Sequence, residues 1–198
     1  GEDYSECANT KGKQLLKYLL INRHKVTPKE ELMDLLWPNY DAVSARNNLN
    51  VVVYGLRQAV KPALGKEALI LFKEGGYTIN PELSIDCDFE AFEAAFEDAL
   101  NSLSSDTSED ALPHLQRAES LYIGPFMEGD HYTEWLQASR DAYQQKYIQI
   151  LEAMDAAYSA HNNLNAQIDI NQKILAVDDC HENAHRRLME CYMESGQR

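Results

Sequence analysis

Residues 27–60 read TPKEELMDLLWPNYDAVSARNNLNVVVYGLRQAV, and this stretch decides the fold. Pro28 suits the first position of a helix, and Thr27 before it suits the N-cap. Glu30 stands three residues after Thr27, which is the spacing of a capping box. Proline disfavours helix at the residue before it, so Pro38 ends this helix. The stretch therefore predicts a short helix followed by a turn.

Asp41 can cap a third helix, which we expect over about residues 42–60. Its apolar residues recur at helical spacing and form one stripe, made of Ala45, Leu49, Val52, Val53, Leu56 and Val60. The opposite side presents Asn47, Asn50, Val51, Tyr54, Gln58 and Lys61, flanked by Arg46 and Arg57. This outward face has amides, an aromatic hydroxyl and cations but no carboxylate, which is unusual because most solvated helix faces mix both signs of charge.

The flanking sequence completes one small domain. Leucines at helical spacing predict a first helix over about residues 11–22. After the third helix, two β-like runs at 69–72 and 77–79 are joined by Lys73-Glu74-Gly75-Gly76, whose glycines suit a hairpin turn. Three helices followed by a hairpin predict a winged helix-turn-helix, to which we assign residues 1–82.

The remainder of the chain has a helical pattern with no convincing strand. We expect helices at about 88–103, 109–123, 132–161, 166–177 and 182–195. Asn162-Asn163 is expected as a C-cap, and Asp179 to Glu182 has capping-box spacing. The step from Tyr147 to Glu182 is close to the roughly 34-residue period of TPR repeats. The predicted fold is mainly α: a winged helix-turn-helix with a β-hairpin wing, followed by an all-α TPR-like domain over 86–198 that is truncated at its C-terminus.

Charge divides the chain in the same way. The 198 residues carry a net charge of −14, yet residues 11–80 hold eleven basic and six acidic residues. Residues 81–198 hold seven basic residues against 23 acidic ones. A basic amino-terminal third joined to an acidic remainder indicates two domains with different partners. No stretch approaches the roughly 20 apolar residues of a membrane span, so no membrane partner is expected.

The sequence offers no constellation for catalysis, a cofactor or a metal. The four cysteines (Cys7, Cys87, Cys180 and Cys191) have no CxxC spacing and are interpreted as buried or half-buried thiols of a cytosolic protein. His181 and His185 put two imidazoles near Cys180, but no fourth ligand stands nearby. We therefore expect no enzyme, and a cytoplasmic location.

Several motifs together resemble the SARP family of bacterial transcriptional activators. The first part carries Lys13-Gln14-Leu15-Leu16-Lys17-Tyr18-Leu19-Leu20, Leu35-Leu36-Trp37-Pro38, and Ala45-Arg46-Asn47-Asn48-Leu49 through Leu56-Arg57. The second part is similar to that family's bacterial transcriptional activator domain, in Asp86, Asp88-Phe89-Glu90, Gly124-Pro125-Phe126, Glu134-Trp135-Leu136, Arg140, Ile174-Leu175-Ala176-Val177-Asp178 and Glu182-Asn183-Ala184-His185-Arg186-Arg187-Leu188-Met189. The family's winged helix opens with a small amino-terminal sheet, which we expect to be absent or truncated here.

The resemblance and the helical-wheel geometry agree on a site for double-stranded DNA. A helix of this type fits the major groove, where amides can pair with adenine and arginine with guanine. The expected base-contacting residues are Asn47, Asn50, Tyr54 and Arg57. The expected phosphate-contacting residues are Thr27, Lys29, Arg46, Lys61 and Lys73.

The sequence thus favours a sequence-specific DNA-binding activator. The resemblance implies RNA polymerase as a partner and a homodimer bound to direct repeats. An alternative is a TPR-like protein-interaction scaffold whose winged helix no longer binds DNA, an interpretation favoured by the acidic total and by Glu74 at the wing tip. Trp135 with Arg140 is interpreted either as an interaction hot spot or as core packing of the long helix.

Overall fold

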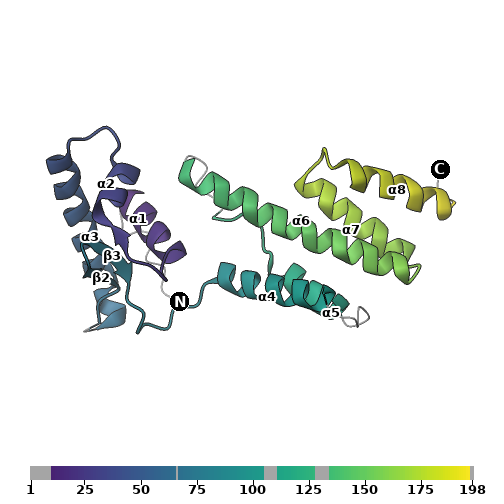
Figure 1. The fold of residues 1–198 in the computed structure, drawn as a ribbon, viewed down its shortest axis with the longest axis horizontal. Coiled ribbons are helices and arrows are strands. Elements are labelled where there is room, and N and C mark those ends of the chain that lie inside the picture. The colour runs from purple at the N-terminus through teal and green to yellow at the C-terminus, as the bar shows by residue number, and fades with distance from the viewer. Residues whose placement is uncertain (1–9, 66, 105–110, 128–133, 197–198) are drawn as a thin grey trace. The chain divides into compact units, whose positions relative to one another are not determined.

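The computed structural model describes residues 10–65, 67–104, 111–127 and 134–196. The chain divides into two compact units, residues 1–85 and 86–198 (Figure 1). Each unit has its own hydrophobic core. The first nine residues, where a small amino-terminal sheet and Cys7 would fall, lie outside the described residues, as do the predicted helix starts at 109 and 132. Within the described ranges, no helix is long and apolar enough to cross a membrane.

The first unit is a winged helix-turn-helix, as predicted. Its elements are α1 (Thr10–Ile21), β1 (Thr27–Pro28), α2 (Lys29–Leu36), α3 (Ala42–Leu64), β2 (Ile70–Lys73) and β3 (Gly76–Ile79). Leucines of α1 and α2 and the inner stripe of α3 form its core together with residues of the hairpin. Helix α3 continues four residues beyond the predicted end, through Pro62, and closes at Gly65, which has a positive φ.

The sheet has a third strand that the sequence did not predict. Strand β1 pairs antiparallel with β3, so the strand order is β1-β3-β2 and Thr27 stands opposite Tyr77. Gly76 allows this pairing, because a Cβ there would lie 2.2 Å from the backbone oxygen of Thr27. A two-residue strand has too short a pattern to be read from sequence.

The role predicted for Thr27 is wrong. The N-cap of α2 is Pro28, and no side chain caps this helix. Because Thr27 belongs to β1, its side chain is fully buried and its hydroxyl has no hydrogen-bond partner in the described part of the chain. A buried hydroxyl cannot reach a phosphate, so Thr27 also leaves the set of expected phosphate contacts.

The segment after the wing belongs to the first unit. Leu83 and Ile85 pack against its hydrophobic core. Arg23 Nη1 donates a hydrogen bond of 2.6 Å to the backbone oxygen of Ile85. The unit therefore extends to residue 85, three residues beyond the boundary assigned from sequence.

The second unit is all helical in its described part. Its elements are α4 (Asp88–Leu103), α5 (Ala111–Leu121), the 3-10 turn η2 (Glu134–Leu136), α6 (Gln137–Ala160), α7 (Leu164–Val177) and α8 (Glu182–Glu194). Helices α6, α7 and α8 follow one another antiparallel, with α7 packed against both (Figure 1). The single helix predicted over 132–161 is wrong at its start, where η2 precedes α6.

One predicted cap in this unit is confirmed. Helix α6 closes through Asn162 and Asn163: Asn162 has a positive φ, and the two amides donate hydrogen bonds to the backbone oxygens of Ser159 and Tyr158, both at 3.0 Å. Asn163 also begins α7, because its side chain accepts a hydrogen bond from the Ala166 amide at 3.2 Å.

The capping box predicted from Asp179 to Glu182 is wrong. The N-cap of α8 is His181, whose Nδ1 accepts a hydrogen bond from the Ala184 amide at 3.2 Å. Imidazole and amide side chains can both supply the acceptor that a helix start requires, so cap spacing alone did not identify the residue.

A buried polar network joins the last three helices. Asp155 of α6 accepts hydrogen bonds from Asn171 Nδ2 at 2.6 Å and from Arg187 Nε at 2.9 Å. Arg187 Nη2 also donates to Gln167 Oε1 at 3.1 Å. Hydrogen bonding to Asp155 raises the pKa of Arg187. The network ties α6, α7 and α8 together by polar contacts as well as by apolar packing.

Candidate nucleic-acid interface

Helix α3 is fixed by its start and by its inner face. The Asp41 carboxylate accepts hydrogen bonds from the amides of Val43 and Ser44, both at 3.0 Å, as the sequence predicted. Hydrogen bonding to Ser44 lowers the pKa of Asp41. Five of the six residues in the predicted inner stripe are buried, and Val60 is partly buried against the same core; the buried five are Ala45, Leu49, Val52, Val53 and Leu56. Burying this stripe leaves the opposite face of α3 to solvent.

Most of the predicted outward face is exposed. Arg46, Asn47, Asn50, Tyr54 and Lys61 are all exposed, and Tyr54 is 65% exposed. Asn50 also accepts a hydrogen bond from the Tyr77 hydroxyl of β3 at 3.3 Å. No aspartate or glutamate occurs anywhere in α3, so the face has no acidic group of its own.

Arg57 differs from the other residues of the predicted base-contacting set. Its side chain is half-buried, and Nε and Nη2 donate to the backbone oxygen of Ile70 at 3.0 and 2.7 Å. The guanidinium therefore holds strand β2 against α3. Sequence reasoning missed this contact because α3 and β2 meet only in the tertiary structure.

The wing carries both charge and aromatic surface. Strands β2 and β3 are joined by Glu74 and Gly75, both with positive φ, and Lys73 is exposed before this turn. The exposed ring of Phe72 packs edge-on against Tyr77, with ring centroids 5.1 Å apart. Glu74 is a non-glycine residue in the left-handed region, and it places an acidic residue at the tip of the hairpin beside its one basic residue, Lys73.

Lys29 stands at the start of α2, on the same unit. Its ammonium lies 3.7 Å from the carboxylate of the next residue, Glu30, and its side chain is 33% exposed. Exposed pairs of this kind contribute little to stability, so the ammonium can exchange this partner for another anion. Of the five predicted phosphate contacts, the structure places Lys29, Arg46, Lys61 and Lys73 at least partly at the surface and buries Thr27.

Comparison with known families assigns both units. Residues 87–198, more than half of the chain, match the family model of the bacterial transcriptional activator domain. The chain belongs to this family. Residues 8–79 match a second model, described as transcriptional regulatory protein, C terminal. A winged helix followed by the activator domain is the SARP-like arrangement that the sequence predicted, and both families are transcription regulators rather than enzymes.

Two mycobacterial proteins are similar over most of this chain. The transcriptional regulatory protein MoaR1 of Mycobacterium tuberculosis is 20% identical over 183 residues, which cover 92% of this chain and 59% of that protein. The structure of Mycobacterium tuberculosis EmbR in complex with a low affinity phosphopeptide matches with a TM-score of 0.77 and 20% identity. The match covers 96% of this chain and 50% of that one. The chain thus spans about three fifths and half the length of these two proteins, and the second likeness concerns the fold.

The bacterial transcriptional activator domain contains an aromatic cavity of about 260 Å³ in its described part. Its lining includes Phe89, Phe92, Phe126 and Tyr143, and the rings of Phe126 and Tyr143 stack at 4.4 Å. Burial raises the pKa of Tyr143. These residues come from α4, α6 and the turn after α5, and the lining also includes the exposed Ile123, so the cavity is partly open to solvent.

Arg140 has a structural task in the activator domain. Its guanidinium donates to the backbone oxygens of Phe126 and Met127 at 3.1 and 3.2 Å. Trp135 is half-buried in η2. Arg140 therefore supports the turn after α5. An interaction hot spot with Trp135 would instead require the Arg140 guanidinium to contact a partner protein.

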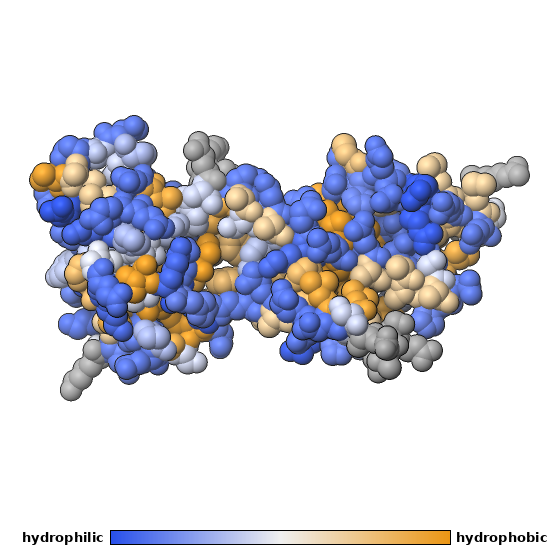
Figure 2. All heavy atoms as spheres, viewed as in Figure 1, coloured by the Kyte–Doolittle hydropathy of each residue, from blue (hydrophilic) through white to orange (hydrophobic). Residues whose placement is uncertain are grey.

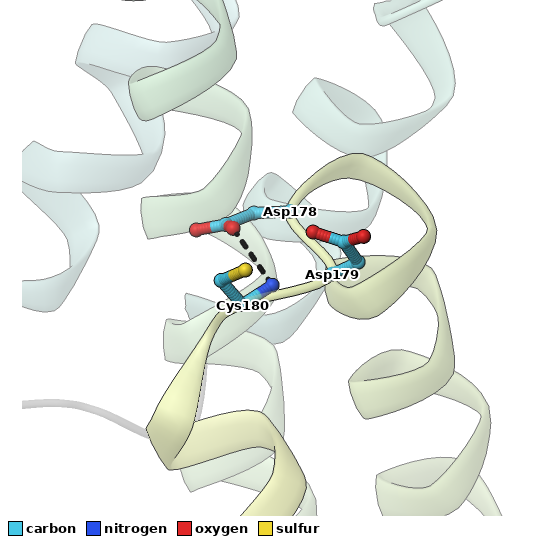
Figure 3. A group of neighbouring side chains, drawn as sticks. All are labelled: Asp178, Asp179 and Cys180. Atoms are coloured by element: carbon cyan, nitrogen blue, oxygen red, sulfur yellow. Dashed lines mark hydrogen bonds between the residues drawn. The ribbon is translucent and has the colours of Figure 1, made fainter.

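The loop between α7 and α8 gathers Asp178, Asp179 and Cys180, whose side chains each bring one ligand atom within 4.8 Å of the others (Figure 3). Asp178 accepts a hydrogen bond from the Cys180 amide at 3.1 Å. Cys180 is exposed, contrary to the prediction of buried or half-buried thiols, and Asp179 raises its pKa. A raised thiol pKa disfavours the thiolate that binds metals.

Proposed function

We propose that this chain is a sequence-specific DNA-binding activator of transcription that inserts α3 into the major groove of duplex DNA. The observation that carries the proposal is the exposed face of α3, which presents amides, an aromatic hydroxyl and cations without a carboxylate. A surface of this composition suits a polyanion whose groove edges offer hydrogen-bond donors and acceptors. The family of the first unit supports the same interpretation.

The proposed contacts follow from exposure. Asn47, Asn50 and Tyr54 are assigned to base edges, because they lie on the outward face of α3. Arg46 and Lys61 on α3, Lys73 on the wing and Lys29 on α2 are assigned to phosphates, which fix the position of the protein on the duplex. Arg57 is proposed to position the wing relative to α3, because its guanidinium binds the backbone of β2.

The helical unit is assigned to protein contacts. Residues 81–198 carry 23 acidic residues against seven basic ones, so this part of the chain is repelled by DNA. We propose that its partner is RNA polymerase, that two copies of the chain occupy direct repeats, and that the protein acts in the cytoplasm, where its DNA target lies. The transcription-regulator families of both units support this assignment.

A competition mobility-shift experiment tests the DNA assignment. Asn47→Ala should weaken binding to the preferred site by about 1–3 kcal/mol and relax preference at one base position. Arg46→Ala, its neighbour in sequence, is the matched control. Arg46→Ala should weaken binding to preferred and random duplexes alike. The slope of log affinity against log salt concentration should fall in magnitude by about 0.9, the value for one phosphate.

The alternative function is a protein-interaction scaffold. It is favoured by Asn50 and Arg57, which are engaged by the wing, and by Glu74 at the wing tip. If the full chain retained no duplex from a pool of random sequences at low salt, the scaffold would replace the activator. Retention of a discrete set of sequences would exclude the scaffold interpretation.

A further inference from the structure

The outward face of α3 carries exposed apolar side chains among its amides. Val43 is 69% exposed and Val51 68% exposed, and neither belongs to the core of the first unit or packs against it. In the view of Figure 2, hydrophobic residues reach the surface of this unit in separate patches among hydrophilic ones. Two exposed valines on a face that is otherwise polar are therefore a distinct feature of α3.

The spacing of these valines matches the spacing of bases. At 100° per residue, Val43 and Val51 lie on the same side of α3 as Asn47 and Tyr54. Eight residues of helix span about 12 Å, because each residue rises about 1.5 Å. Base pairs are stacked about 3.4 Å apart, so the two valines are separated by roughly three to four steps.

The major groove offers one apolar group that a valine can contact, the C5 methyl of thymine. The proposed function places this face of α3 in that groove, and the following inference rests on it. We propose that Val43 and Val51 determine specificity by packing on the methyl groups of two thymines, three to four steps apart, while the amides read the intervening base edges.

The charges around the valines favour DNA over a protein surface. Arg46 and Lys61 are exposed on the same helix, and Lys73 is exposed on the wing. Since α3 contributes no carboxylate, a second copy of this face would bring cations against cations. The partner that complements this face is therefore a polyanion with apolar groups in its groove, which is duplex DNA.

Deoxyuridine tests the proposal, because it lacks only the C5 methyl of thymidine and keeps its hydrogen bonds. The full chain is first used to select a preferred duplex from a random pool. Each thymidine of that duplex is then replaced singly by deoxyuridine. Two positions three to four steps apart should each lose about fourfold in affinity, the factor expected for burying one methyl group.

The valine variants show which valine contacts which thymine methyl group. Val51→Ala should abolish the thymidine preference at one position and Val43→Ala at the other. Gln58→Ala, a polar exposed neighbour on the same face, is the matched control and should leave both preferences at about fourfold. Since all three side chains are exposed, the thermal unfolding of the variants should match that of the parent.

The outcomes separate this inference from the function on which it rests. If the pool yields no preferred duplex, the DNA assignment itself fails. If a duplex is selected but deoxyuridine has no effect, or the effect persists in both valine variants, the methyl contacts are wrong while DNA binding stands. If Val51→Ala lowers self-association in sedimentation and leaves the thymidine preference unchanged, the valines form a protein interface and the proposal is overturned.

Discussion

Gly76 lies where the backbones of β1 and β3 approach too closely for a side chain. Gly76→Ala would place a Cβ 2.2 Å from the Thr27 backbone oxygen, so β1 and β3 would have to separate. We expect a loss of about 2–4 kcal/mol in the free energy of unfolding, measured by urea titration. Gly55→Ala is the matched control on α3, since nothing lies within 4 Å of the added methyl. It should stabilise by up to about 1 kcal/mol, and equal effects of the two substitutions would contradict the close approach.

Thr27 gives a second prediction for a single residue. Its hydroxyl is buried without a partner among the described residues, and an unsatisfied buried group costs about 1–3 kcal/mol. Thr27→Val keeps the shape and removes the hydroxyl, so it should raise the free energy of unfolding by roughly 1 kcal/mol. DNA affinity should not change. A uniform loss of affinity for all duplexes would restore Thr27 as a phosphate contact.

Tyr18 makes the first unit sensitive to alkaline pH. Burial, together with its hydrogen bond to Glu31, raises the pKa of Tyr18 to about 12. The folded-state pKa of Tyr18 exceeds the unfolded value of about 10. The protonated Tyr18 side chain therefore stabilises the fold fully below pH 10, and this stabilisation is lost between pH 10 and about 12. In thermal unfolding, Tyr18→Phe should lower Tm at pH 8. The difference in Tm between this variant and the parent should shrink as the pH rises to 11. A constant difference in Tm across this range would contradict the shift.

At the scale of elements, α3 and the wing behave as one piece. Arg57 binds the backbone of β2, and the Tyr77 hydroxyl of β3 binds Asn50. Under the proposed function, these two contacts fix the geometry in which α3 and the wing would meet DNA. For this reason, loss of Arg57 is expected to weaken phosphate contacts of the wing as well as base contacts of the helix.

The polar network of the activator domain gives a prediction for its last three helices. Asp155→Ala removes the acceptor shared by Asn171 and Arg187 and leaves both donors at the helix interface. Breaking a fully buried pair costs about 3–5 kcal/mol, and the 30% exposure of Arg187 reduces the expected loss to about 2–3 kcal/mol in chemical denaturation. Glu190→Ala removes the exposed partner of Arg187 and is the control, with an expected loss below about 1 kcal/mol. Equal losses would show that the network does not stabilise the interface.

At the scale of the whole molecule, the proposed division of labour predicts the result of truncation. A fragment ending at residue 87 keeps Leu83 and Ile85 on the first core and should bind the preferred duplex like the full chain. It should fail to activate in reconstituted transcription, because the acidic domain is absent. A fragment ending at residue 82 is the control for the boundary, and it should unfold at a lower temperature. Full activation by the 87-residue fragment would move the polymerase contact into the winged helix.

The sequence by itself determined what depends on local pattern. The capped start of α3 at Asp41, its buried stripe from Ala45 to Leu56, and the hairpin were predicted because helix periodicity, caps and turn glycines act over a few residues. The family motifs added the order of the two domains. The exposed part of the candidate site, Asn47, Asn50 and Tyr54, followed from the same periodicity.

Only the tertiary structure decided how segments distant in sequence meet. It placed Thr27 in a third strand beside Gly76 and brought Arg57 into hydrogen-bond contact with the Ile70 backbone. It also joined Asp155 of α6 to Arg187 of α8. Each of these contacts joins groups 13 to 49 residues apart, so no local pattern signals it. The physical reason is that a polar side chain takes the partner that folding brings within hydrogen-bond distance, and packing of the cores decides which partner that is.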